Sequence, residues 1–334
     1  MKVIVLAGGT STERVVSLTS ASCVAAALRK AGHKVTVIDP GTGWTVIDPS
    51  DAPEKTSQKS CGLPGKRSAK LLTGSDIVFN TLHGGQGEDG TLNAVLELLD
   101  IPYVGSGPGP SAAAMNKVVS KRLFSSVGVP TPPYLVLECG DEADWPALLD
   151  AAAVQIGFPA VIKPADQGST VGLSKASTGE KLMEAVKKAA EYSQQILVEK
   201  FIEGRELTVG VVAGIPMPVL EVVVPGGFYD FEAKYHSHSN KYICPAQIPG
   251  RVVQEAQRLA LEAFNVLGLA DYARIDFRLD LGFGLWCLEA NNQPGMTDSS
   301  LLPKAAGVLG FDLSGLLEKL LHSALARYGV RAIK

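Results

Sequence analysis

The sequence lacks the features that define disulfide-rich, membrane and P-loop proteins. Its five cysteines are scattered and include no C-x-x-C pair, which argues against a disulfide framework or a zinc site. No stretch approaches the ~20 apolar residues of a membrane span. The apolar run at residues 1–6 is too short for a signal peptide and predicts a buried strand. No G-x-x-x-x-G-K-[ST] segment occurs, so any ATP site is not of the P-loop type. We expect a cytoplasmic protein.

The chain also lacks a strong excess of either charge. Its 31 Lys and Arg residues against 34 Asp and Glu residues give a formal net charge of −3. That balance gives no electrostatic reason to expect nucleic acid or an anionic membrane as a partner. Hydrophobic residues make up 46% of the chain, enough for substantial cores. Because 334 residues are too many for one ordinary core, we expect two or three domains.

The order of the predicted elements indicates an α/β fold. In the first third strands alternate with helices, which is typical of a parallel sheet covered by helices. Residues 206–212 and 219–224 look like paired strands, and residues 40–70 are an irregular excursion rich in Pro, Gly, Ser and Lys. The other predicted strands are residues 3–6, 34–38, 76–81, 103–104, 134–137, 160–163, 196–201, 272–279 and 284–289. The predicted helices are residues 17–30, 91–99, 111–127, 145–155, 180–192 and 253–267, with two more at the C-terminus.

One motif resembles a dinucleotide-binding loop. Residues 85–90 match G-x-G-x-x-G between a strand and a helix, which suggests a dinucleotide site. However, Glu88 and Asp89 would lie beside a negatively charged pyrophosphate, and the acid expected about 20 residues later for the ribose is missing. A glycine turn whose acids favour a helix N-terminus explains the pattern equally well. An NAD-dependent oxidoreductase is therefore a minor alternative.

The strongest chemical signal lies in the last third of the chain. Arg274 and Asp276 are on one predicted strand, and Glu289 and Asn291 are on the next, with 289 − 276 = 13 residues between the acids. A strand, a glycine turn and a returning strand would bring the acids side by side. Two carboxylates and an amide oxygen suit Mg²⁺. A solvated hairpin with chance acids is the alternative, and the strongly apolar neighbours of these residues argue against it.

Several glycine-rich segments follow predicted strands. Residues 163–172 place Lys163 before a Gly/Ser-rich turn, where the backbone could approach phosphates, although a plain hairpin would look similar. In residues 8–14, Glu13 could hold a substrate ammonium group or simply favour a helix entry. Residues 292–301 could bind oxyanions through backbone N–H groups or form an ordinary connection. His83, at a strand end beside glycines, is a fair site candidate, whereas His236 and His238 in a polar loop are interpreted as solvated.

Taken in order, these segments make the chain resemble the D-alanine–D-alanine ligase family of the ATP-grasp superfamily. The resemblance runs from residue 2 to about residue 310, and its motifs are residues 8–14, 83–90, 163–172, 228–235, 274–276, 289–291 and 294–301. It implies a three-domain ATP-grasp architecture with a Rossmann-like parallel-sheet domain first. The expected domains are residues 1–105, 106–200 and 201–334, with a lid loop at about 225–245.

The resemblance also implies an activity and its residues. The reaction would join two D-alanines with ATP through a D-alanyl phosphate, for peptidoglycan precursors of the cell wall. Catalytic roles would fall to Glu13, Ser169, Tyr235, Arg274, Gly295 and Ser300, and D-alanine binding to His83, Ser300 and Leu301. ATP would be held by Lys117, Lys163, Glu199, Ile202, Glu206 and Lys234, and two Mg²⁺ or Mn²⁺ ions by Asp276, Glu289 and Asn291.

The individual roles are expectations of the same resemblance. Glu13 would hold the first D-alanine's ammonium group, while Arg274 and the Gly295 amide would stabilise the oxyanion. Ser300 and Leu301 would bind the second D-alanine's carboxylate. A mobile loop would carry Tyr235 over the site, where it couples to Ser169 and Glu13. The expected partners are these small molecules and a second copy of the chain in a homodimer.

The sequence departs from the family pattern at three places. Asn116 stands where Asp is usual before the lysine, Val15 stands where an acid is usual, and Asn292 and Gln293 replace small residues before Pro294. None of these changes removes an expected ligand. D-alanine–D-lactate and D-alanine–D-serine ligases are the nearest alternatives, and a non-catalytic nucleotide-binding regulator is a further one, opposed by the intact set of acids and lysines.

Overall fold

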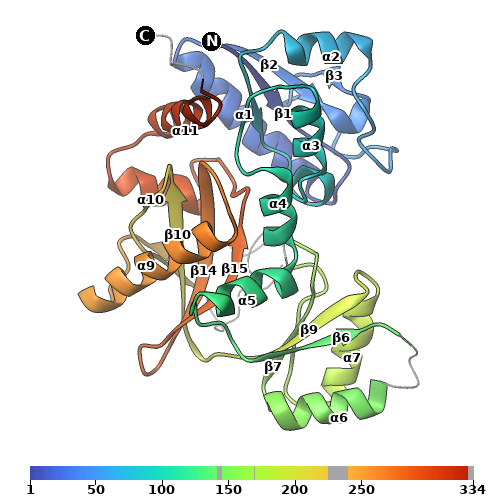
Figure 1. Cartoon of the computed structure of the whole chain (residues 1–334), viewed down its shortest axis with the longest axis vertical. Coiled ribbons are helices and arrows are strands. Elements are labelled where there is room, and N and C mark those ends of the chain that lie inside the picture. Colours follow the sequence, from blue (N-terminus) through green and yellow to red (C-terminus); the bar gives the residue numbers. More distant parts are fainter. Residues whose placement is uncertain (141–144, 169, 225–239, 330–334) are drawn as a thin grey trace.

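Three sheets follow one another along the chain. The computed structural model describes residues 1–140, 145–168, 170–224 and 240–329 (Figure 1). The first sheet is mainly parallel, and the second and third are antiparallel. This mixture of strands and covering helices confirms the α/β fold class. No helix in these four ranges is long and apolar enough to cross a membrane.

The first sheet has the order β3-β2-β1-β4-β5. Its strands are β1 (Lys2–Leu6), β2 (Lys34–Asp39), β3 (Thr45–Val46), β4 (Ile77–Asn80) and β5 (Tyr103–Val104), and only β3 runs antiparallel to its neighbour. All four residues of β4 are buried, as a parallel sheet covered on both faces requires. Leu72 of α2 (Lys66–Thr73) and Leu92 of α3 (Thr91–Leu98) pack with Ile4 and Leu6 on one face.

The other face of this sheet is covered from both ends of the chain. Val3 and Val5 pack in one core with α1 (Arg14–Lys30) and α11 (Leu313–Arg327). Figure 1 shows α11, in red, beside the blue α1. The last helix of the chain therefore belongs to the core of the first sheet.

The second sheet has the order β6-β9-β7-β8 and is wholly antiparallel. Its strands are β6 (Tyr134–Glu138), β7 (Ala160–Pro164), β8 (Ser174–Ala176) and β9 (Gln195–Lys200). Leu149 of α6 (Trp145–Ile156) and Leu182 of α7 (Gly179–Ala190) pack on one face of this sheet. Thr178 caps α7 by accepting a hydrogen bond from the Lys181 N–H. On the opposite face, Leu197 packs with Val118 and Ala165.

The third sheet has the order β13-β12-β10-β14-β15, with β11 paired to β10. Its strands are β10 (Gly204–Val212), β11 (Ile215–Pro216), β12 (Leu220–Val223), β13 (Lys241–Ile243), β14 (Tyr272–Asp280) and β15 (Leu285–Asn291). Val252, Ala256, Leu259 and Ala263 line the buried side of α9 (Gly250–Val266), at the spacing of an amphipathic helix. The short helix α10 (Leu301–Val308) follows the loop after β15.

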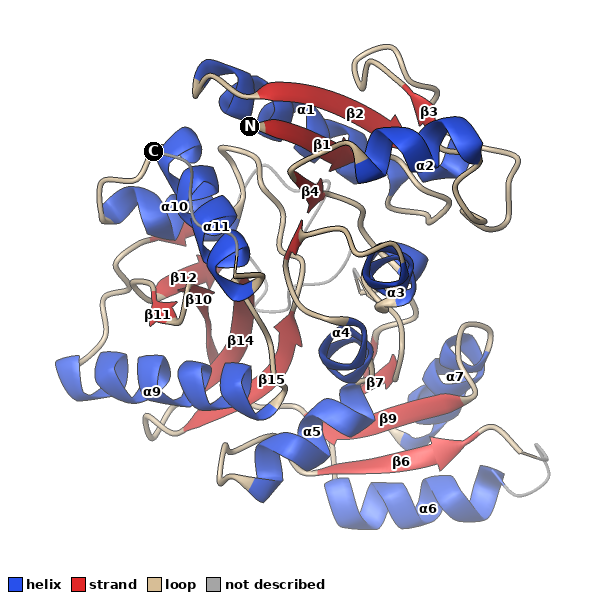
Figure 2. Cartoon of the chain, turned by 45° about the horizontal axis from the view of Figure 1, so that its top comes forward, coloured by secondary structure: helices blue, strands red, loops and turns tan. Residues whose placement is uncertain are grey.

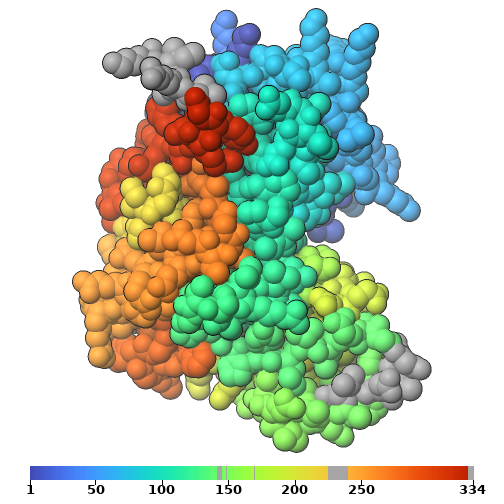
Figure 3. Space-filling view, in the orientation of Figure 1, coloured from blue at the N-terminus to red at the C-terminus, as the bar shows by residue number. Residues whose placement is uncertain are grey.

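Two helices connect the sheets. The predicted single helix over residues 111–127 is wrong, because the chain forms α4 (Pro108–Met115) and α5 (Lys117–Ser126) with a break at Asn116. The Asn116 side chain accepts hydrogen bonds from the Val118 and Val119 N–H groups, so it starts a new helix. Figure 2 shows α4 between the first sheet and α5, and α5 between the second and third sheets. In the space-filling view of Figure 3 this segment runs down the middle of the molecule in teal and green.

Residues 40–70 hold more structure than predicted. They contain the one-turn helix η1 (Pro40–Thr42), the edge strand β3 and the first residues of α2. The strands β8 and β11 were also not predicted. Each of these strands has two or three residues, too few to give an alternating pattern in the sequence.

Candidate active site

A cavity opens between the second and third sheets. Its walls come from β7, β9, β10, β14 and β15, with α5 at one end. Eight of the sequence-predicted residues line it, namely Lys117, Lys163, Glu199, Ile202, Glu206, Arg274, Asp276 and Glu289. Segments that are far apart in the sequence therefore meet here, as the resemblance implies.

Three buried charged groups form the floor of this cavity. Glu199 lies between two lysines, with Oε1 2.8 Å from Lys163 Nζ and Oε2 2.9 Å from Lys121 Nζ. Burial opposes ionisation of Glu199, but the two ammonium groups outweigh it and hold the pKa of this carboxyl below its usual range. Burial lowers the pKa of Lys121, an effect that Glu199 opposes. The carboxylate is thus fixed as an anion that orients Lys163.

A third lysine approaches from the start of α5. Lys117 Nζ donates to the Gln167 carbonyl at 2.6 Å and lies 3.7 Å from Glu289 Oε2. Burial lowers its pKa, and the Glu289 charge acts in the opposite direction. The break at Asn116 makes Lys117 the first residue of α5, whose backbone N–H groups carry partial positive charge. Lys117 and Lys163 together make this end of the cavity suited to phosphate groups.

The acids opposite the lysines are neighbours across a strand pair. The β14–β15 register aligns Asp276 with Glu289 and Arg274 with Asn291, so the predicted hairpin is confirmed. Asp276 accepts hydrogen bonds from Arg274 Nε at 2.9 Å, Thr208 Oγ1 at 2.5 Å and Asn291 Nδ2 at 2.9 Å. Because the Asn291 amide N–H donates to Asp276, the amide oxygen of Asn291 faces away from that carboxylate.

An arginine organises the chain between β9 and β10. Arg278 donates to the carbonyls of Ile202 and Gly204 at 3.0 and 2.8 Å and lies 3.3 Å from Glu206 Oε2. Burial, and after it the charge of Asp276, raises the pKa of Glu206 to about 7. These contacts set the rim of the cavity opposite the lysines.

A second cavity adjoins the first. Arg274 and Gly168 line both, and the second also includes His83, Asn291, Gly295, Ser300 and Leu301. Ser300 directly precedes α10 but does not cap it with its side chain, so the first N–H groups of that helix remain available to an anion. A Cβ built on Gly295 would lie 2.8 Å from Ser300 Oγ, so a side chain there would crowd the serine.

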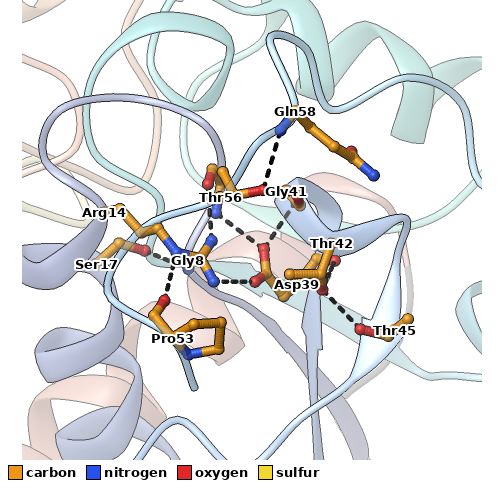
Figure 4. A network of polar contacts seen from close by, with 11 residues as sticks. Gly8, Arg14, Ser17, Asp39, Gly41, Thr42, Thr45, Pro53, Thr56 and Gln58 are labelled. Atoms are coloured by element: carbon orange, nitrogen blue, oxygen red, sulfur yellow. Dashed lines mark hydrogen bonds and ion pairs between the residues drawn. The ribbon is translucent and has the colours of Figure 1, made fainter.

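The loop that carries Glu13 is fixed from behind by a buried arginine (Figure 4). Arg14 pairs with Asp39 at 2.6 Å and donates to the carbonyls of Gly9 and Pro53, each at 2.8 Å. The Asp39 carboxylate also accepts from the Gly9 N–H at 3.0 Å. Only 3% of the Arg14 side chain and none of the Asp39 side chain are exposed. Glu13 directly precedes Arg14, so these contacts also fix the backbone that carries Glu13.

Glu13 and His83 reach the same place from different strands of the first sheet. A Cβ built on Gly168 would lie 3.4 Å from Glu13 Oε2 and 3.7 Å from Glu88 Oε2. Glu13 itself is not among the lining residues of the two cavities, but Gly168 lines both. His83 lies 3.4 Å from Glu88 through Nδ1 and 3.3 Å from the Ser20 hydroxyl through Nε2. The first sheet thus presents carboxylates to the point where the cavities meet.

Two models of a known protein family match most of the chain. Residues 2–106 match the model described as D-ala D-ala ligase N-terminus, and residues 123–322 match the one described as D-ala D-ala ligase C-terminus. The chain belongs to the D-alanine–D-alanine ligase family. It is therefore a ligase, and the oxidoreductase interpretation of residues 85–90 falls away.

Individual members of the family match almost end to end. The D-alanine–D-alanine ligase of Bordetella petrii is 40% identical over 330 residues, which cover 98% of this chain and 93% of the relative. That of Synechococcus sp. strain JA-3-3Ab is 37% identical over 98% of this chain and 94% of the relative.

Solved structures of the family have the same fold. The D-alanine–D-alanine ligase of Bacillus anthracis complexed with ATP has a TM-score of 0.80 and 26% identity, over 98% of this chain and 99% of that one. The VanG D-Ala:D-Ser ligase of Enterococcus faecalis has a TM-score of 0.82 and 27% identity, over 97% and 99%.

Five residues named in the sequence analysis lie outside the described residues, namely Ser169, Lys234, Tyr235, His236 and His238. The described end of the expected lid segment is β13, whose Tyr242 lines the second cavity.

Other site residues were not predicted from the sequence. Lys121 and Arg278 hold Glu199 and the chain at residues 202–206, and Lys304 lines the second cavity with its Nζ 3.3 Å from the Asp298 carbonyl. Lys121 lies one helical turn after Lys117 and Arg278 two residues after Asp276, so both share a face with a predicted residue. That spacing was the available signal.

Proposed function

We propose that this chain joins two molecules of D-alanine into D-alanyl-D-alanine at the expense of ATP. The observation that carries the proposal is the alignment of Asp276 with Glu289 in a cavity that also holds Lys117 and Lys163. Amide synthesis from a carboxylate needs a leaving group. In this reaction the donor carboxylate takes the terminal phosphoryl group of ATP, releasing ADP, and the acceptor amine then displaces phosphate from the acyl carbon and loses a proton.

We assign the first cavity to ATP. Lys117 and Lys163 neutralise the phosphates, and Lys234 adds a further charge. Glu199 keeps Lys163 in place, while Glu206 and Ile202 hold the adenosine, with Glu206 as a ribose acceptor. The mixed lining supports this assignment, since Val161, Leu173, Phe201 and Leu288 give an apolar surface for a base beside the charged end.

The acids and the amide of the β14–β15 hairpin fit divalent cations. Asp276, Glu289 and Asn291 offer only oxygen ligands, as Mg²⁺ and Mn²⁺ prefer. These three would hold two ions, which supply charge neutralisation for the transferring phosphoryl group. No group of three or more His, Cys, Asp or Glu side chains gathers as a metal cage in the described ranges, so the substrate phosphates would provide remaining ligands.

We assign the second cavity to the two amino acids. Glu13 holds the donor ammonium group, with His83 beside it, and Arg274 and the Gly295 N–H stabilise the oxyanion that forms at the donor carbonyl. The acceptor carboxylate binds the Ser300 hydroxyl and the Leu301 N–H. The absence of a side-chain cap from Ser300 at the start of α10 supports this last assignment.

The remaining assignments follow the family. Three domains, at residues 1–105, 106–200 and 201–334, would close on the substrates, with α11 of the third packing against the core of the first. A lid at about residues 225–245 would carry Tyr235 toward Ser169 and exclude water, which protects the acyl phosphate from hydrolysis. We also propose a cytoplasmic homodimer that supplies cell-wall precursors.

Acceptor choice distinguishes this enzyme from D-serine and D-lactate ligases. Tyr235 favours the dipeptide form by its resemblance to the family pattern. The similarity to VanG, whose name specifies D-serine, makes D-serine the second candidate acceptor.

The test is a phosphate-release assay with ATP and Mg²⁺ in four parallel reactions. D-alanine alone should release phosphate in step with dipeptide, detected by mass spectrometry, and L-alanine should release none. D-serine or D-lactate, each with D-alanine, should give less mixed product than the dipeptide. No dipeptide from D-alanine would refute the proposed function, and a dominant mixed product would replace the acceptor.

A further inference from the structure

A pair of buried amides joins the first sheet to the loop after β15. Gln293 Nε2 donates to the Asn80 carbonyl at 2.7 Å, and Asn80 Nδ2 donates to Gln293 Oε1 at 3.1 Å. Only 2% of Asn80 and 7% of Gln293 is exposed. Gln293 is one of the two departures from the family pattern before Pro294.

Asn80 and the neighbouring Asn292 add further hydrogen bonds to this pair. Asn80 Nδ2 also donates to the Gly87 carbonyl at 2.9 Å, and its Oδ1 accepts from the Leu82 N–H at 3.0 Å. The neighbouring Asn292 Nδ2 donates to the Glu88 carbonyl at 3.0 Å. We call these contacts between the first sheet and the loop after β15 the seam. It consists of neutral hydrogen bonds, which neither salt nor moderate pH changes weaken as they weaken exposed ion pairs.

The seam joins the segment that ends β4 to the segment that follows β15. Asn80 ends β4 three residues before His83, in the segment that approaches Glu13. Gln293 lies two residues after Asn291 and two before Gly295. The pair therefore fixes the groups assigned to the donor ammonium relative to the groups assigned to the oxyanion.

We propose that Asn80 and Gln293 are positioning residues for ligation, on the basis of the function proposed above. Asn80 lines neither cavity, and Gln293 lines the second one but has its amide nitrogen and oxygen bonded to Asn80. Their pairing holds the donor carbonyl against the oxyanion groups and keeps the seam closed to water while the acyl phosphate exists. A displacement of about 1 Å at such a place can cost about 100-fold in rate.

The principal experiment compares Gln293→Ala with Asn93→Ala in the full-length protein. Asn93 is also a buried amide in the N-terminal part, with Nδ2 2.6 Å from the Ser106 carbonyl, but it does not contact the loop after β15. Dipeptide, phosphate, the KM of each substrate and Tm are measured for both variants.

The expected result separates positioning from stability. Gln293→Ala should lower kcat for dipeptide by about 10- to 100-fold, raise the KM of the donor D-alanine and leave the KM of ATP unchanged. It should also release more phosphate than dipeptide, because water reaches the acyl phosphate. Asn93→Ala should lower Tm yet keep phosphate and dipeptide equal. Equal phosphate and dipeptide in both variants, with the same kcat, would overturn the proposal.

A swap of the two side chains provides the second test. Asn80→Gln and Gln293→Asn each change the length of the pair by one methylene, and the double variant restores the total length. Each single variant should uncouple phosphate from dipeptide, and the double variant should recover part of the coupling. A double variant no better coupled than the worse single one would contradict a length-matched pair. Failure of the unmutated protein to make dipeptide would instead refute the proposed function.

Discussion

Replacing Arg14 by lysine tests how the Glu13 loop is held. The substitution keeps the positive charge but removes the planar fork that reaches three acceptors at once. In the structure these acceptors are Asp39 at 2.6 Å and the carbonyls of Gly9 and Pro53, both at 2.8 Å. A lysine ammonium can keep the pairing with Asp39, but it cannot span both carbonyls.

The cost follows from the burial of this site. Two hydrogen bonds from a charged donor are lost, at about 1.5–3 kcal/mol each, so the free energy of unfolding should fall by about 3 kcal/mol or more. At about 2.1 cal/mol/K of unfolding entropy per residue over 334 residues, this corresponds to a decrease in Tm of about 4 °C or more. Because Glu13 directly precedes Arg14 on this loop, the KM of the donor D-alanine should rise while the KM of ATP stays the same.

Arg258→Lys is the matched control. Arg258 also pairs with carboxylates, Glu255 at 2.6 Å and Glu262 at 2.5 Å, but about half of its side chain is exposed. Exposed pairs contribute at most about 1 kcal/mol, so Tm should hardly change. Thermal unfolding and steady-state kinetics of both variants decide the matter. A Tm for Arg14→Lys as high as that of Arg258→Lys would refute the reasoning from burial.

Three further outcomes can be measured. Glu289→Gln should abolish most turnover and raise the Mg²⁺ concentration needed for half-maximal rate; a normal rate at low Mg²⁺ would contradict the metal assignment. Burial and the charge of Asp276 raise the pKa of Glu206 from 4.5 to about 7, so the folded chain binds the proton more tightly. The free energy of unfolding should therefore fall as pH rises between these values, by up to about 1.4 kcal/mol per pH unit, and urea titrations of Glu206→Gln should give a flatter profile. Lys304 lines the second cavity, whereas Lys319 of α11 lines neither cavity. Lys304→Met should therefore raise the acceptor KM several-fold relative to Lys319→Met, measured with the donor site saturated; equal values would contradict a role of Lys304 in binding the acceptor.

The elements with long periodic patterns could be predicted from the sequence. Strands β1 and β4 carry continuous apolar runs, strands β2 and β14 alternate apolar with polar residues, and helices α1 and α9 carry apolar residues at helical spacing. The break between α4 and α5 could not, because the apolar pattern continues through Asn116. Only the hydrogen bonds from its side chain to Val118 and Val119 reveal the new helix start.

The part of the site that lies on one continuous hairpin could be predicted from the sequence. The Asp276–Glu289 pairing follows from a strand, a glycine turn and a returning strand, which local sequence can specify. Lys121 gave only the signal of its spacing from Lys117, and a lysine within a helix is usually solvated. Its complete burial depends on Glu199, which lies on a strand 78 residues later (199 − 121).

The residues that connect the sheets are the hardest to infer from one sequence. Asn80 and Gln293 are separated by 213 residues, and each alone resembles a polar residue at a strand end or in a turn. Their burial becomes favourable only because each satisfies the other, since an unpaired buried amide costs about 1–3 kcal/mol. A change at either position should therefore be tolerated only with a compensating change at the other.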